Sequence, residues 1–269
     1  MSKTLVNLSP EGVAGAVTEP AGLDAQSVRF AGSGADMVDG YLVRPAAAGR
    51  LPGMIVIHEA GGLNDHIRDV AGRIAQLGYV TLAVDLYTRE GGPPPMDDVQ
   101  AMMSRLFSIP DRRVVEDLKG AAEFLRARED ASGKVGCIGF CMGGRYTLLF
   151  ACSTGSLDAA VDCWGGFIDR STPEEISTDA RPEPPLDLAG RLSCPLLAAV
   201  GAEDVNPSPA LGEQLRERAS ESGHPVQVDI YDGAGHAFFA DYRPTYRPEP
   251  AARLWHRIVP FLASNLNDG

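Results

Sequence analysis

The stretch that decides the fold reads Lys134-Val-Gly-Cys-Ile-Gly-Phe-Cys-Met-Gly-Gly144. Its first half is a short apolar run that predicts a buried strand, and the residues from Gly143 to Cys152 have the character of a helix. The turn between them, Gly139-Phe-Cys141-Met-Gly143, carries a cysteine between two glycines. Such a turn exposes its central side chain at a sharp strand-to-helix corner, where glycines fit against neighbouring backbone. The stretch therefore predicts an α/β protein with Cys141 as a candidate nucleophile.

Strand-like and helix-like segments alternate on both sides of this turn. Short apolar strands alternating with helices favour a mainly parallel central sheet with helices on both faces. Two earlier β-rich runs predict an antiparallel pair at one edge of the sheet. The predicted strands are Val28–Phe30, Val38–Val43, Met54–Ile57, Val80–Leu86, Lys134–Phe140, Ala159–Trp164, Leu196–Val200 and Val226–Tyr231. The predicted helices are Ile67–Leu77, a stretch after Gly91-Gly-Pro-Pro-Pro, about Pro110–Arg128, Gly143–Cys152, Pro209–Glu221 and Pro250–Leu266.

Domain organisation follows from composition along the chain. Residues 1–26 are weakly patterned and are expected to be a lead-in to one domain over 27–269, because neither a composition break nor an internal repeat interrupts the rest. Residues 168–192 are rich in proline and charge and predict a surface loop of functional length. We expect this loop and segment 89–108 to wall a substrate pocket.

Charge and cysteine content limit the possible partners and compartment. The formal net charge of −12 argues against nucleic acid and against an anionic membrane surface as partners. No apolar run approaches the roughly 20 residues that cross a bilayer, and the first residues lack a signal-peptide core. Five cysteines without a Cys-x-x-Cys pair predict a cytoplasmic protein with neither disulfides nor structural zinc. We expect a monomer or a small homo-oligomer.

Two more segments place reactive side chains directly after predicted strands. Gly201-Ala-Glu-Asp204 follows one strand and Asp232-Gly-Ala-Gly-His236 follows the next. The order nucleophile, acid, histidine is the order of α/β-hydrolases, and chemistry in open α/β sheets collects at the carboxyl ends of strands. Glu203 competes with Asp204 for the role of acid.

Other interpretations of the cysteine turn are open. A buried cysteine in a tight turn would have the same local pattern. A dinucleotide site is excluded, because it needs Gly-x-Gly-x-x-Gly whereas this turn reads Gly-x-x-x-Gly-Gly. If Cys141 is the nucleophile, the backbone N–H of Met142 at the helix start can bind a developing oxyanion.

Five motifs in one chain resemble the dienelactone hydrolase family from about residue 26 to the end. The resemblance implies an α/β-hydrolase fold and a triad of Cys141, His236 and Asp204. The motifs are His58-Glu-Ala-Gly-Gly, Asp85-Leu-Tyr, Gly139-Phe-Cys-Met-Gly-Gly, Gly201-Ala-Glu-Asp and Gly235-His-Ala-Phe.

The resemblance also implies roles around the triad. Glu59 would control the protonation of the Cys141 thiol; the alternative is a salt bridge that supports a loop. The backbone N–H of Ala60 would be the second oxyanion donor, and Arg89 would hold a substrate carboxylate.

One position departs from the family pattern. Where the family has a second carboxylate-binding arginine, four residues after the histidine, this chain has Ala240. Arg243 or Arg247 from the same loop are candidates to replace it. The departure concerns the natural substrate and leaves the hydrolase chemistry intact.

The predicted function is hydrolysis of a small-molecule ester or lactone through a thioester on Cys141, without a metal or organic cofactor. Two alternatives remain at this stage. A thiol-dependent acyltransferase or thioesterase would use the same triad and would favour an added thiol or alcohol over water. A non-catalytic small-molecule receptor would bind its ligand and leave it unchanged.

Overall fold

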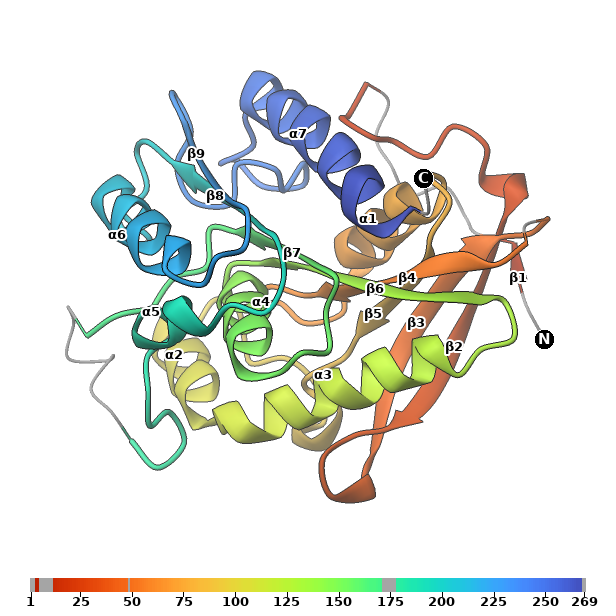
Figure 1. Ribbon diagram of the computed structural model, residues 1–269, viewed down its shortest axis with the longest axis horizontal. Helices are drawn as coiled ribbons and strands as arrows, with labels where there is room; N and C mark the ends of the chain where they lie inside the picture. The colour runs from red at the N-terminus through yellow and green to blue at the C-terminus, as the bar shows by residue number, and fades with distance from the viewer. Residues whose placement is uncertain (1–2, 5–11, 48, 171–177, 268–269) are drawn as a thin grey trace.

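The computed structural model describes residues 3–4, 12–47, 49–170 and 178–267, and it confirms the mixed α/β architecture (Figure 1). In this described part, nine strands form one sheet in the order β1-β2-β3-β5-β4-β6-β7-β8-β9. The strands are β1 (Lys3–Thr4), β2 (Leu23–Ala31), β3 (Met37–Pro45), β4 (Leu51–Ile57), β5 (Val80–Val84), β6 (Ala131–Phe140), β7 (Ala159–Cys163), β8 (Leu196–Gly201) and β9 (Val226–Tyr231). The α-helices are α1 (Asp65–Ala75), α2 (Val99–Ser108), α3 (Asp111–Arg126), α4 (Met142–Ser153), α5 (Pro185–Leu188), α6 (Pro209–Ser220) and α7 (Pro248–Leu266).

The sheet is parallel from β5 through β4, β6, β7 and β8 to β9. The first three strands pair antiparallel, and β3 also runs antiparallel to β5, which confirms the predicted N-terminal edge. Because parallel neighbours need crossover connections, helices cover both faces. Helices α1 and α7 pack on one face, and α3, α4 and α6 pack on the other (Figure 1).

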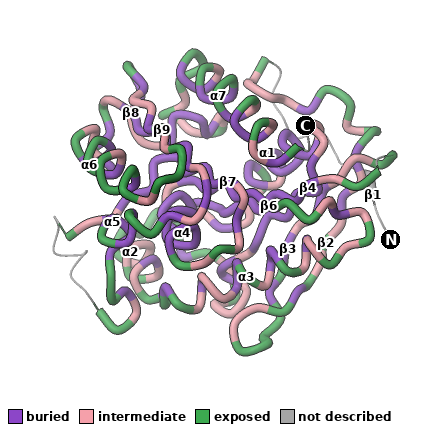
Figure 2. Tube along the Cα trace, in the orientation of Figure 1, coloured by how far each residue is buried: buried purple, intermediate pink, exposed green. Residues whose placement is uncertain are grey.

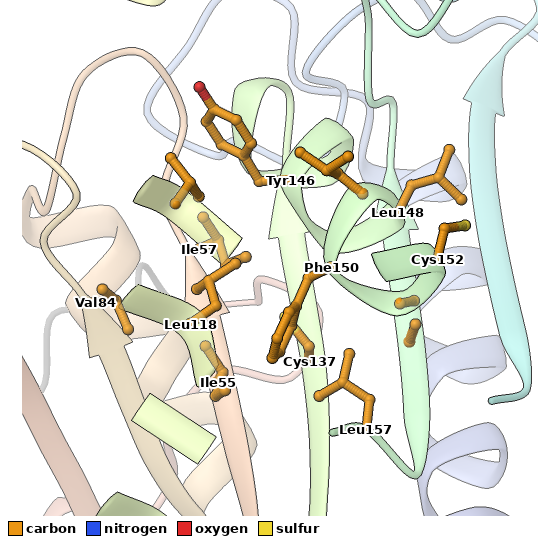
Figure 3. Packing of buried hydrophobic residues seen from close by; sticks show 14 of the residues in the cluster. Ile55, Ile57, Val84, Leu118, Cys137, Tyr146, Leu148, Phe150, Cys152 and Leu157 are labelled. Atoms are coloured by element: carbon orange, nitrogen blue, oxygen red, sulfur yellow. The ribbon is translucent and has the colours of Figure 1, made fainter. Parts of the chain in front are cut away.

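Alternation along the central strands divides the core into two layers. In β4, Ile55 and Ile57 belong to the layer beneath α3 and α4, whereas Met54 and Val56 belong to the layer beneath α1 and α7. Figure 3 shows the first layer, where Phe150 of α4 lies over the strands. Strands β5, β7 and β8 are buried along their length, and exposed residues gather on the outer sides of the helices (Figure 2).

Local signals determine where the helices begin. The side chain of Asn64 accepts a hydrogen bond from the backbone N–H of Ile67 (3.0 Å) and so caps α1, while Asp98 caps α2 through Ala101 (2.9 Å).

In the described part of the chain, no helix is both long enough and apolar enough to span a membrane.

Two sequence-based boundaries need correction. Strand β2 begins at Leu23, so the predicted division between residues 26 and 27 falls inside a strand that pairs with β3 over its whole length. Val17, from the expected lead-in, is also buried. Within the expected loop 168–192, the structure has α5 and a 3-10 turn at Ala189–Arg191. Residues 1–2, 5–11 and 171–177 of these two segments lie outside the described residues.

Candidate active site

Cys141 occupies a strained corner between β6 and α4. Its backbone has φ 55° and ψ −115°, a conformation that L-residues rarely adopt. Its N–H donates to the carbonyl of Cys163 (3.0 Å), and its own carbonyl accepts from the N–H of Arg145 (3.1 Å). Strain of about 1–3 kcal/mol persists only where surrounding structure enforces it, and it typically marks a functional residue.

The two glycines of the turn are required by close backbone approach. A Cβ on Gly139 would overlap the carbonyl of Gly143, and a Cβ on Gly143 would overlap the carbonyl of Ile57 in β4. Neither neighbour can move without breaking the turn or the sheet. The glycines therefore allow the tight corner that holds Cys141 at the carboxyl edge of the sheet.

Asp204 and His236 follow β8 and β9 and meet at the same edge. Nδ1 of His236 lies 2.9 Å from Oδ2 of Asp204, and the other oxygen of Asp204 accepts the N–H of Asn206 (3.0 Å). Asp204 is 6% exposed. The hydrogen bond selects Asp204 over Glu203 as the acid that orients the histidine.

The electrostatic environment of His236 favours its charged form. Burial acts to lower the pKa of His236, but the neighbouring Cys141 and the hydrogen bond that His236 donates to Asp204 outweigh it, and the pKa is raised well above its usual value. A histidine that holds its proton beside a thiol stabilises the thiolate. The arrangement can therefore supply both a nucleophile and a general acid.

The two predicted oxyanion donors line the same cavity as Cys141. Met142 is the first residue of α4, so its N–H has no acceptor within the helix. Ala60 follows β4, two residues after His58, whose Nδ1 contacts the carbonyl of Glu59 (2.7 Å). The positive end of the α4 dipole adds to the field at this point.

Glu59 is buried and paired. Its Oε2 accepts hydrogen bonds from Nη2 of Arg243 (2.9 Å) and from the hydroxyl of Tyr242 (3.0 Å), and Nε of Arg243 donates to the same hydroxyl (2.8 Å). Among the contacts of the described residues, no hydrogen bond joins Glu59 to Cys141. The side chain thus has the partners of a loop-supporting ion pair, while it still lines the cavity that Cys141 lines.

Arg89 does not lie in the site, which corrects the expectation for its role. Its guanidinium donates to both oxygens of Asp117 (2.8 and 2.9 Å) and to Asp36 (3.0 Å). Burial opposes the charge, but these carboxylates raise the pKa of Arg89. The side chain joins α3 to the turn after β2, because two carboxylates distant in sequence hold it there.

The loop after His236 supplies a different arginine. Arg243 lines the cavity, whereas Arg247 donates back to the carbonyls of Pro244 (3.1 Å) and Tyr246 (2.9 Å). Ala240 is buried in the core layer beneath α7. Of the two candidates to replace the family arginine, Arg243 is the one that reaches the site.

The cavity beside Cys141 holds about 280 Å³ and is mostly apolar. Both segments expected to wall it contribute, 89–108 and 168–192. Four of its apolar lining residues come from or near α2, namely Met96, Met102, Met103 and Leu106. Such a cavity fits the apolar part of a small ester or lactone.

Two buried arginines in the cavity wall were missed by the sequence analysis. Arg145 directly follows the Cys141 turn and lies in the first turn of α4. That position could have marked it in the sequence as a residue of the cavity wall. Arg181 belongs to the proline-rich segment, where no periodicity marks buried positions.

Together, the strained turn at Cys141, the Asp204–His236 pair and the sheet order match an α/β-hydrolase. The sequence profile of the Dienelactone hydrolase family matches residues 38–266. The chain belongs to this family and is a hydrolase of the ester and lactone class.

Curated relatives agree with this assignment. A protein of Methylorubrum extorquens, named provisionally as a carboxymethylenebutenolidase, is 35% identical over 82% of this chain and 75% of its own length. A Bradyrhizobium protein, named provisionally as a 2-oxo-3-(5-oxofuran-2-ylidene)propanoate lactonase, is 31% identical over 84% of this chain and 89% of its own.

A solved structure also matches. The crystal structure of a provisionally named dienelactone hydrolase from Klebsiella pneumoniae has a TM-score of 0.82 and 33% identity, covering 90% of this chain and 98% of that one.

Proposed function

We propose that this protein opens activated esters or lactones by nucleophilic catalysis at Cys141, with His236 and Asp204 completing the triad. The observation that carries the proposal is a single strained cysteine that shares one cavity with a histidine bonded to a buried carboxylate. The provisional names of the relatives, a carboxymethylenebutenolidase and a lactonase, support a lactone with an enol-type leaving group.

In the first half of the reaction, the Cys141 thiolate attacks the carbonyl carbon of the substrate. The backbone N–H groups of Met142 and Ala60 hold the resulting oxyanion. When the C–O bond breaks, the proton on His236 passes to the leaving oxygen, and a thioester remains on Cys141.

In the second half, His236 is neutral and takes a proton from water. The hydroxide attacks the thioester, the C–S bond breaks, and the thiolate–imidazolium pair is restored with release of the acid. Asp204 keeps the imidazole in the tautomer that presents Nε2 to the thiol.

Glu59 and Arg243 act at the edge of this chemistry. The paired arginine neutralises Glu59, so the carboxylate does not repel a thiolate in the same cavity. A substrate that draws Arg243 away would free the Glu59 carboxylate to take a proton from any Cys141 that is still a thiol. In this way Glu59 would control the protonation of Cys141 when substrate arrives.

The test compares wild type with Cys141→Ala and Cys141→Ser on cis-dienelactone and on p-nitrophenyl acetate. We expect hydrolysis by the wild type and loss of at least about 10³-fold in kcat with Cys141→Ala. A mass spectrum of rapidly quenched enzyme should show the acyl group on the peptide that contains Cys141.

The outcomes separate the chemistry from the substrate. Turnover of p-nitrophenyl acetate alone, dependent on Cys141, would keep the triad and exclude dienelactone. Preferential transfer to an added thiol would favour an acyltransferase. Equal rates for wild type and Cys141→Ala would refute the proposed nucleophile.

A further inference from the structure

The three arginines that line the active-site cavity differ in how their charge is balanced. Arg243 forms an ion pair with Glu59 (2.9 Å). Arg145 donates to both oxygens of the buried Asp111 (2.6 and 2.9 Å). For Arg181, no carboxylate partner occurs among the residues that the structure describes. Among the described residues, the cavity wall therefore carries one arginine, Arg181, that forms no ion pair.

Arg181 is buried, with 8% of its surface exposed. One Nη donates to the carbonyl of Leu106 and contacts the hydroxyl of Tyr146 (3.4 Å), and the guanidinium lies 4.3 Å from the ring centroid of Phe107. Its Nε has no hydrogen-bond partner in the described structure. These contacts orient the guanidinium but leave its charge unpaired.

Burial makes this charged state unfavourable. It lowers the pKa of Arg181, and Arg145 acts in the same direction, while Tyr146 and Asp111 oppose the shift without cancelling it. A buried charge is expected to be paired or to meet a ligand of opposite sign. An anion entering the cavity would remove the penalty, and a planar carboxylate matches the donor fork of a guanidinium.

Nearby carboxylates do not compete for this role. Both oxygens of Asp111 accept hydrogen bonds from Arg145, which also donates through Nε to the carbonyl of Phe167 (3.1 Å). Glu59 is bound to Arg243, and Asp204 to His236. Within the described residues, each of these acids already has a cationic partner, so this part of the chain leaves the role of counterion to a ligand.

We propose that Arg181 binds a carboxylate of the substrate, at a position separate from the Glu59–Arg243 pair. The inference rests on the proposed function, since it assigns an anionic substrate to the same cavity. The favoured substrate is an ester or lactone whose carboxylate is joined to the reacting carbonyl by a short apolar spacer. Met102, Met103 and Leu106 offer that spacer an apolar wall.

A binding experiment tests the assignment without using turnover. Iodoacetamide alkylates Cys141 in the full-length protein, and pentanoate or its neutral analogue pentanamide is added as a protecting probe. We expect the wild type to be half-protected by pentanoate at a concentration at least about tenfold below that for pentanamide. In Arg181→Met this preference should fall to about twofold or less.

Two further variants complete the design. Arg191→Met removes the same charge from an exposed position in the same segment and should keep the wild-type preference. If Arg181→Met does not fold, Arg181→Gln makes the same test, because its amide can still donate to the carbonyl of Leu106. A preference for pentanoate that survives in the folded Arg181 variant overturns the proposal.

Hydrolysis gives a parallel measurement. Mono-p-nitrophenyl glutarate and p-nitrophenyl pentanoate differ by a terminal carboxylate in place of a methyl group. Arg181→Met should raise KM at least about tenfold for the glutarate ester and leave the pentanoate ester within about twofold. If neither ester is hydrolysed through Cys141 while pentanoate still protects, the proposed function fails and the carboxylate site stands. An equal loss on both esters contradicts the site.

Discussion

Replacing Arg89 by methionine should destabilise the protein while leaving its catalysis intact. The variant removes the two hydrogen bonds to Asp117, whose side chain is 1% exposed, and the one to Asp36. Asp117 then keeps the backbone N–H of Ser33 (2.8 Å) as a donor but loses its counterion.

The size of the effect follows from that burial. Breaking a buried ion pair by removing one partner costs about 3–5 kcal/mol of stability. Because the guanidinium of Arg89 is partly exposed, we expect a loss of about 3 kcal/mol here. An unfolding entropy of about 2.1 cal/mol/K per residue gives about 0.6 kcal/mol/K for 269 residues. The melting temperature should therefore fall by about 5 °C.

Urea denaturation measures the expected loss of stability, and steady-state kinetics on mono-p-nitrophenyl glutarate measure whether catalysis is unchanged. The control is Arg29→Met, which breaks the exposed pair with Asp39 (side chains 61% and 53% exposed) and should cost less than about 0.5 kcal/mol. Unchanged stability together with a tenfold rise in KM for Arg89→Met would refute the structural role and restore the role that family resemblance implies.

Two further predictions concern the triad and a buried acid. Asp204→Asn should lower kcat on p-nitrophenyl acetate by about 10²–10⁴-fold, because His236 loses the partner that fixes its tautomer; a loss below tenfold contradicts this. Burial raises the pKa of Asp162 to about 7, despite the hydrogen bond from Gly165. The folded state then holds a proton that the unfolded state has lost, so unfolding free energy should fall, by up to about 4 kcal/mol, as pH rises from about 4 to 7. Urea titrations at the two pH values should show that the unfolding free energy of Asp162→Asn depends less on pH than that of the wild type.

The sequence placed the three proposed triad residues at one edge of the sheet because its signals are local. Each reactive residue directly follows an apolar strand, and the parallel sheet brings the strand ends together. The turn at Cys141 was equally predictable, since close backbone approach admits only glycine at positions 139 and 143.

The errors came from contacts distant in sequence. The role expected for Arg89 failed because Asp36 and Asp117, from other parts of the chain, hold its side chain. Arg181 escaped notice because a proline-rich segment has no period that marks burial. Strand β2 was placed too late because its first residues alternate weakly and depend on pairing with β3 for their structure.

The origin of the cavity wall has a consequence for how such an enzyme can change. Cys141 and the proposed oxyanion donors, Met142 and Ala60, lie just past the ends of central strands, where a shift would disturb the whole sheet. Helix α2, which supplies Met102 and Met103, has Leu106 as its one buried residue. Substitutions along this helix can therefore reshape substrate preference at small cost to folding. In the proposed mechanism, reactivity and selectivity are therefore encoded in different segments, which can evolve at different rates.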